Sequence, residues 1–243
     1  MNIMDLRDPE KIASISKEEL LQVIGGMGQN MKDRMKAEQL QKVRAYRELN
    51  EKAVKGQILF TGSSLMEQFP INEIALSDGD TRYIYNRGIG GTNTDDFLRE
   101  IDTVLLDLEP TKLFINIGTN DINAREDGQD WEAYLLNNLD KIYTIINEKL
   151  PNCETYVMAY YPVNPDFNPE VAAYMLSTRT NEAVNRVNGE VKELAEKHGF
   201  TFIDANAGLK DEQGRLKAEY TKEGMHFFPS GYYQVYEAIK QYI

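Results

Sequence analysis

Short apolar runs alternate with longer segments of helical spacing over most of the chain. The apolar runs predict five strands, at Gln57–Thr61, Arg82–Asn86, Lys112–Gly118, Thr155–Tyr160 and Thr201–Asp204. Apolar residues spaced three and four apart predict helices around Thr94–Leu108, Trp131–Lys149 and Pro169–His198, and a last helix over Ser230–Tyr242. Strands that are apolar throughout and alternate with helices are typical of a parallel sheet covered on both faces.

The segment before the first strand has a different pattern. From Lys17 to about Val54 it is rich in Glu, Lys, Gln and Arg, and its apolar residues keep the spacing of an amphipathic helix. We expect Gly25-Gly26 to break this helix in two, because each glycine costs about 1 kcal/mol there relative to alanine. We therefore predict a helical extension over residues 1–55 and a main domain over residues 56–243. The extension can pack on the main domain, form a homodimer interface or act as a lid.

Composition narrows the class of partner. The 243 residues carry 39 acidic and 27 basic side chains, a net charge of -12, and the basic residues form no cluster. Such a chain is expected to bind neither nucleic acid nor anionic membranes. No stretch reaches the length of a membrane span, and residues 1–10 lack the basic and apolar regions of a signal peptide. We expect a cytoplasmic protein.

Two residues of reactive type are expected to be structural. Cys153 is the single cysteine, so no intrachain disulfide can form, and no His with Asn or Asp points to it as a nucleophile. His198 ends a predicted helix directly before Gly199, where a cationic side chain suits the helix dipole.

Polar residues and glycines follow three of the predicted strands. Ser64 comes after the first strand and opens a helix, so it is either a helix cap or an exposed nucleophile. The second strand leads into Arg87-Gly88-Ile89-Gly90-Gly91-Thr92, the glycine loop, whose N–H groups can approach a ligand. Its spacing is that of neither a P-loop nor a dinucleotide motif. After the third strand, the Asn120 amide can donate into a site or simply form a turn.

His226 lies in a loop bounded by Gly224 and Pro229. Glu223, three residues upstream, can accept from Nδ1–H and leave Nε2 free as the base for a hydroxyl. The alternative is a loop histidine packed under the last helix. Because the carboxyl ends of parallel strands meet at one edge, these segments together supply a nucleophile, a base, an orienting acid and oxyanion donors.

The four segments, in this order, resemble the sequence blocks of the SGNH hydrolase superfamily, the GDSL-like esterases and lipases. Gly62-Ser63-Ser64-Leu65 is similar to the nucleophile block, with Ser63 where the family usually has Asp. Gly91 and Gly118-Thr119-Asn120-Asp121 are similar to the two blocks that supply oxyanion donors. Glu223-Gly224-Met225-His226 is similar to the Asp-x-x-His block, with Glu in place of Asp. The resemblance covers about Gln57 to Ile243.

The resemblance implies a three-layer α/β/α sandwich with a five-stranded parallel sheet in flavodoxin-like order, preceded here by the helical extension. It implies Ser64, His226 and Glu223 as catalytic residues and an oxyanion hole made by the N–H groups of Ser64 and Gly91 and the Asn120 amide. It also implies that no metal or cofactor is needed. Either Glu223 orients His226, or a backbone carbonyl does so and Ser64 and His226 work as a dyad.

The substrate expected is a small soluble ester, of a short acyl chain or of an acetylated carbohydrate, cleaved through an acyl-enzyme. Lysophospholipids and thioesters are other substrates of the family, and the fold does not choose among them. Four apolar residues beside the motifs either line an acyl pocket or belong to the core: Met66, Met225, Phe227 and Phe228. The rival functions are a non-catalytic carbohydrate- or ligand-binding module on this fold and a phosphate-binding protein that uses the glycine loop.

Overall fold

The computed structural model describes residues 17–125 and 127–243 of the chain. The chain divides into two compact units after Lys42. The described part of the first unit belongs to helix α2 (Lys17–Asn50), and the second unit, Val43–Ile243, contains the sheet and all the candidate site residues. The expectations about the first ten residues fall outside the described part. Within that part, no helix is both long and apolar enough to cross a membrane.

Five parallel strands form one sheet in the second unit. Their order is β2-β1-β3-β4-β5, which confirms the five-stranded parallel sheet and its flavodoxin-like order. The bounds agree with the predicted strands to within two residues: β1 (Ile58–Gly62), β2 (Ile84–Asn86), β3 (Lys112–Asn116), β4 (Glu154–Met158) and β5 (Thr201–Ile203).

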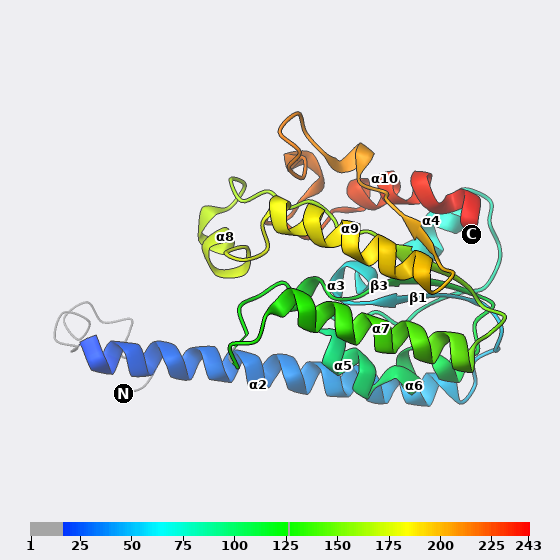
Figure 1. Ribbon diagram of the computed structural model, residues 1–243, viewed down its shortest axis with the longest axis horizontal. Coiled ribbons are helices and arrows are strands. Elements are labelled where there is room, and N and C mark those ends of the chain that lie inside the picture. The colour runs from blue at the N-terminus through cyan, green and yellow to red at the C-terminus, as the bar shows by residue number, and fades with distance from the viewer. Residues whose placement is uncertain (1–16, 126) are drawn as a thin grey trace. The chain divides into compact units, whose positions relative to one another are not determined.

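Helices cover both faces of this sheet (Figure 1). Successive strand residues point to opposite faces, so Leu59 and Leu113 belong to one apolar cluster while Phe60 and Phe114 belong to the other. The first cluster includes buried residues of α5 (Thr94–Arg99), α6 (Ile101–Val104), α7 (Trp131–Lys149) and α9 (Asn181–Lys197). The second includes those of α3 (Ser64–Glu67), α4 (Ile71–Ser77) and α10 (Pro229–Ile239). The three-layer α/β/α sandwich is thereby confirmed.

The predicted break in the N-terminal helix is wrong. α2 continues without interruption through Gly25 and Gly26. Two glycines cost about 2 kcal/mol relative to alanine, which long flanking stretches of good helix formers can offset. Side-chain hydrogen bonds four residues apart add to the helix on the C-terminal side of the glycines, from Gln29 to Asp33 and from Arg34 to Glu38.

The segment Pro169–His198 is two helices rather than one. α8 (Pro169–Met175) ends early, and α9 begins after Thr180, whose side chain caps it by accepting from the Ala183 N–H at 3.1 Å. The residues between these helices include Arg179, whose side chain is buried. The segment Thr94–Leu108 is similarly divided, into α5, α6 and a short 3-10 turn at Leu106–Leu108. Helix α7, in contrast, has the predicted bounds at both ends.

Candidate active site

Ser64 lies directly after β1, as the first residue of α3. The turn that places it depends on Gly62, which has a φ of 149° and lies against the backbone of β3: a Cβ there would be 1.9 Å from the Asn116 carbonyl oxygen. That same carbonyl accepts from the Ser63 N–H at 3.2 Å. Only glycine fits this close approach, so the turn holds the serine at the carboxyl edge of the sheet.

His226 connects Ser64 to a carboxylate. Its Nε2 lies 2.9 Å from Ser64 Oγ, and its Nδ1 lies 2.5 Å from Oε1 of Glu223. The same oxygen accepts from the backbone N–H of His226 at 2.9 Å. The longer glutamate side chain therefore reaches the imidazole, and the three predicted side chains form one hydrogen-bonded series in the order Glu223, His226, Ser64.

The loop that carries His226 is closed on itself by Thr221, which is fully buried. The Thr221 hydroxyl donates to the His226 carbonyl at 3.0 Å and accepts from the Gly224 N–H at 2.8 Å. Gly224 has a φ of 105°, and its carbonyl accepts from the Asn164 N–H at 2.7 Å. These bonds hold the backbone of the loop from both sides, so the position of His226 does not depend on Glu223 alone.

The glycine loop follows β2 and passes close to Ser64. The Asn86 side chain accepts from the Gly88 N–H at 2.9 Å, and the Ile89 N–H donates to the Gly62 carbonyl at 3.0 Å. Gly91 has a φ of 71°. Within the part of the chain that the structure describes, the N–H groups of Ser64 and Gly91 donate to no other group, so they are available to an oxyanion.

The end of α2 supports the glycine loop from the outside. The buried Tyr46 hydroxyl donates to the Gly88 carbonyl at 2.9 Å. The Asn50 side chain accepts from Arg87 Nε at 3.0 Å, and the Arg87 guanidinium lies 4.9 Å from the centre of the Tyr46 ring. Tyr46 and Asn50, which precede the segment covered by the family resemblance, thus hold the glycine loop at one side of the candidate site.

Asn120 lies in the short 3-10 helix Thr119–Asp121 after β3. Its Nδ2 donates to the Thr92 carbonyl at 2.9 Å, and its Oδ1 accepts from Nη2 of Arg179 at 3.1 Å. Among the described residues, Thr92 is the one acceptor of Nδ2, so its second N–H has no protein acceptor there. The neighbouring Asp121 accepts from the N–H and hydroxyl of Thr94, which joins this turn to α5, and burial raises the pKa of Asp121 to about 6.

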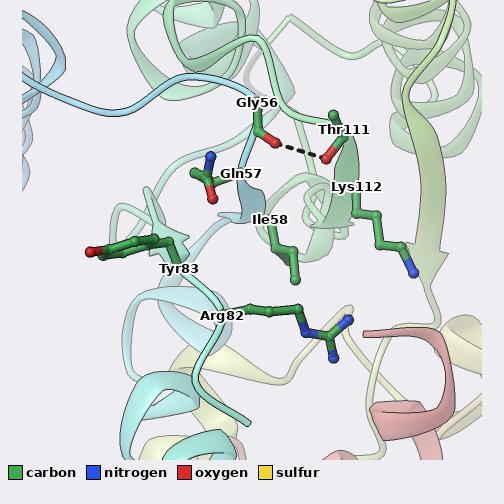
Figure 2. A pocket seen from close by; sticks show the side chains of 7 residues that line it. All are labelled: Gly56, Gln57, Ile58, Arg82, Tyr83, Thr111 and Lys112. Atoms are coloured by element: carbon green, nitrogen blue, oxygen red, sulfur yellow. Dashed lines mark hydrogen bonds between the residues drawn. The ribbon is translucent and has the colours of Figure 1, made fainter.

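A polar cavity of about 470 Å³ opens beside Asn120. It is lined by Asn93, Asp95, Asn120, Asp121, Asn123, Ala124, Arg125 and Asp127. A smaller cavity of about 190 Å³ lies at the other end of the strands, where β1 and β3 begin (Figure 2). Because that cavity is at the amino ends of the strands, it is separate from Ser64 and His226.

The apolar residues beside the motifs belong mostly to the core. Met66 and Phe227 are fully buried in the cluster under α10, Met225 is buried against Val163, and Phe228 is half exposed. An acyl pocket made by Met66 or Phe227 is therefore excluded in this arrangement.

The two residues expected to be structural lie away from the site. His198 follows α9, with its Nε2 2.8 Å from Asp140, and its ring packs edge-on against Tyr143. Cys153 is half-buried, and burial raises the pKa of its thiol to about 11.

Sequence reasoning missed Arg179, Tyr46 and Thr221. None of them lies in a motif, and Arg179 comes 59 residues after the Asn120 it contacts. The partners of Arg179 and Tyr46 are remote in the sequence, so these two contacts leave no local pattern.

The chain matches the GDSL-like Lipase/Acylhydrolase family over residues 72–234, and it belongs to that family. Its members are hydrolases, and the chain shares the α/β fold of the related solved structures.

Particular relatives extend this comparison. A solved structure from Streptococcus pneumonia, named for platelet activating factor, is 32% identical, with a TM-score of 0.80, covering 90% of this chain and 98% of the other. Axe2, an acetylxylan esterase from Geobacillus stearothermophilus, shares the fold at 14% identity and a TM-score of 0.57, covering 77% of this chain and 94% of the other. The N-acylneuraminate cytidylyltransferase of Escherichia coli O18:K1:H7 is 27% identical over 84% of this chain, which spans only 45% of that protein.

Proposed function

We propose that this protein is a serine esterase that removes short acyl groups, in particular acetyl groups, from a carbohydrate. The observation that carries the proposal is the hydrogen-bonded series of Glu223, His226 and Ser64. Beside it lie the Ser64 and Gly91 N–H groups, which have no acceptor among the described residues, and the Asn120 amide, whose Nδ2 uses one of its two N–H groups on Thr92. A binding module needs no hydroxyl matched to an imidazole in this way, which favours catalysis over binding.

In the first half of the reaction, Nε2 of His226 takes the proton of Ser64 Oγ as that oxygen forms a bond to the ester carbonyl carbon. The carbonyl oxygen becomes an oxyanion, and the carboxylate of Glu223 stabilises the imidazolium. When the tetrahedral intermediate collapses, the carbon–oxygen bond to the alcohol breaks and Nε2 returns its proton to the leaving alkoxide. The acyl group is then an ester of Ser64.

In the second half, Nε2 accepts a proton from water, whose oxygen attacks the acyl carbon. Collapse of the second intermediate breaks the bond to Ser64 Oγ, which recovers the proton from His226. The products are a carboxylic acid and the free enzyme. In both halves the oxyanion accepts from the Ser64 and Gly91 N–H groups and from Asn120 Nδ2, donors that need no reorganisation during the reaction.

The proposed substrate class follows from the polarity of the cavity beside Asn120. Its lining offers amides, carboxylates and a guanidinium, which suit hydroxyl-rich ligands better than long alkyl chains. The side chains of Met66 and Phe227 are buried in the core, which also favours a short acyl group. The names of two relatives, an acetylxylan esterase and an N-acylneuraminate enzyme, add carbohydrate substrates to the test.

The first experiment compares hydrolysis of 4-nitrophenyl acetate, butyrate and octanoate by the wild type and Ser64→Ala. We expect turnover by the wild type that falls with chain length, and none above background by the variant. A wild type inactive on all three esters would point to a binding module. Activity that survives in Ser64→Ala would remove Ser64 as the nucleophile.

The second experiment measures acetate release from acetylated xylan and from O-acetylated N-acylneuraminate, with a lysophospholipid and an acyl thioester as alternatives. We expect kcat/KM to be highest on an acetylated sugar. A preference for the lysophospholipid or the thioester would overturn the carbohydrate assignment while leaving the esterase chemistry in place.

A further inference from the structure

Arg179 is a buried cation beside the candidate site. Only 5% of the residue is exposed, and no carboxylate within the described residues forms an ion pair with it. Burial lowers the pKa of its guanidinium to about 10, and Asp121 is the acidic group that counteracts this shift. Burying an arginine without an ion pair lowers the stability of the fold, so we expect this side chain to serve a function at the site.

The guanidinium contacts the two walls of the site. Its Nη2 donates to Oδ1 of Asn120 at 3.1 Å, its Nη1 donates to the thioether of Met225, and its Nε has no partner among the described residues. Met225 directly precedes His226, so Arg179 joins the loop of the base to the turn that carries Asn120.

The bonds of Asn120 fix which way its amide faces. A guanidinium only donates, and the Thr92 carbonyl only accepts, so Oδ1 must face Arg179 and Nδ2 must face Thr92. The flipped amide would place two donors together and two acceptors together. With the orientation fixed, the remaining Nδ2–H is committed to the site. The positively charged guanidinium that donates to Oδ1 also polarises the amide, which makes that N–H a stronger donor.

We propose that Arg179 is a positioning residue of the oxyanion hole, which holds the Asn120 amide with its free N–H toward the reacting carbonyl oxygen and strengthens that donor. The inference rests on the proposed esterase function. A positioning role differs from a packing role in one respect. The effect of Arg179 on the reaction then depends on Asn120 and disappears when the Asn120 amide is absent.

The test is a double-mutant cycle on kcat with 4-nitrophenyl acetate, using Arg179→Met, Asn120→Ala and the double variant. We expect Arg179→Met to lower kcat about 10- to 100-fold with little change in KM, because the lost interaction is made to the transition state. In the Asn120→Ala background, the same substitution should change kcat by no more than about twofold.

Two further variants complete the design. Arg179→Lys keeps the charge and a donor, and we expect it to recover part of the lost kcat. Arg186→Met removes an exposed arginine of α9 that pairs with Glu132 on the surface, and it should leave kcat unchanged. If Arg179→Met fails to fold, as judged by thermal unfolding, Arg179→Leu takes its place in the cycle, since it also removes every donor to Asn120.

An effect of Arg179→Met that is equally large with and without the Asn120 amide would overturn the proposal, as would an unchanged kcat. These outcomes are distinct from failure of the proposed function. That failure would appear as a wild type without esterase activity, or as activity that survives in Ser64→Ala, and the proposal for Arg179 would fall with it.

Discussion

Replacing Glu223 by Gln tests whether the negative charge of the carboxylate stabilises the imidazolium of His226 that forms during the proposed reaction. The substitution keeps the side-chain length and an oxygen that can accept from Nδ1–H, so it removes mainly the negative charge. Oε1 lies 2.5 Å from Nδ1 and 2.9 Å from the backbone nitrogen of the same residue, which places the carboxylate next to the positive charge that forms in the transition state.

The size of the effect follows from this separation. With the charges centred about 4 Å apart and an effective dielectric constant of about 20, the interaction is worth about 4 kcal/mol. Because about 1.36 kcal/mol corresponds to a tenfold change in rate, Glu223→Gln should lower kcat by roughly a thousandfold. KM should change little, since the imidazolium is absent from the ground state.

The assay is steady-state hydrolysis of 4-nitrophenyl acetate near neutral pH. Glu219→Gln is the matched control, because it removes the same charge from an exposed side chain just upstream of the His226 loop. A loss of kcat of only about fivefold or less in Glu223→Gln would refute the electrostatic argument and indicate a Ser64–His226 dyad. Glu223→Asp should fall between the wild type and Glu223→Gln, since its shorter side chain keeps the charge but lengthens the contact.

Three other predictions concern the frame around the site. Gly62→Ala should destabilise the protein by about 3 kcal/mol or more, because the new methyl group clashes with the Asn116 carbonyl and because the φ of this residue is unfavourable for alanine. Gly79→Ala, at a φ of 88° with open space around it, should cost only about 1 kcal/mol, and equal midpoints in urea would contradict the steric argument. Asp121→Asn should change the pH dependence of stability: the wild-type carboxyl, with its pKa raised by burial to about 6, stabilises the fold most at low pH and loses that contribution as pH rises through 6. The stability of the wild type relative to Asp121→Asn should therefore fall by up to about 3 kcal/mol between pH 4 and pH 7, and a constant difference in urea unfolding at the two pH values would show that the pKa is not raised. Tyr46→Phe removes the donor to the glycine loop and should lower kcat several-fold at a stability cost of about 1 kcal/mol, while unchanged turnover would show that the loop keeps its position without this bond.

Much of the architecture was accessible from the chain alone because it depends on local periodicity. The five strands and α7 follow from apolar runs and helical spacing, and the carboxyl-edge location of the motifs follows from strand–helix alternation. The flavodoxin-like order came instead from the resemblance to a family. The helix expectations that failed concern continuity: α2 is not broken at Gly25-Gly26, whereas Thr94–Leu108 and Pro169–His198 are each divided. At these positions small differences in helix propensity compete with turns and helix caps.

For the candidate site, too, some features were predictable from the sequence and others were not. The positions of Ser64, Asn120 and His226 after strands and in a bounded loop made them candidates, and the resemblance to a family supplied their expected roles. The structure brings Ser64 and His226 into contact. Whether Glu223 reaches the imidazole could not be read from residue types, because one methylene and the path of a loop decide it.

The sequence by itself determined which residue types stand at the carboxyl ends of the strands, because the chemistry of a short motif is written in consecutive positions. Only the tertiary structure decided which side chains support them. Arg179 contacts Asn120, which lies 59 positions earlier in the chain. Tyr46 contacts Gly88 of the glycine loop, which lies 42 positions later. Such contacts depend on how separate elements pack, and packing distances between remote segments have no local signature in the sequence.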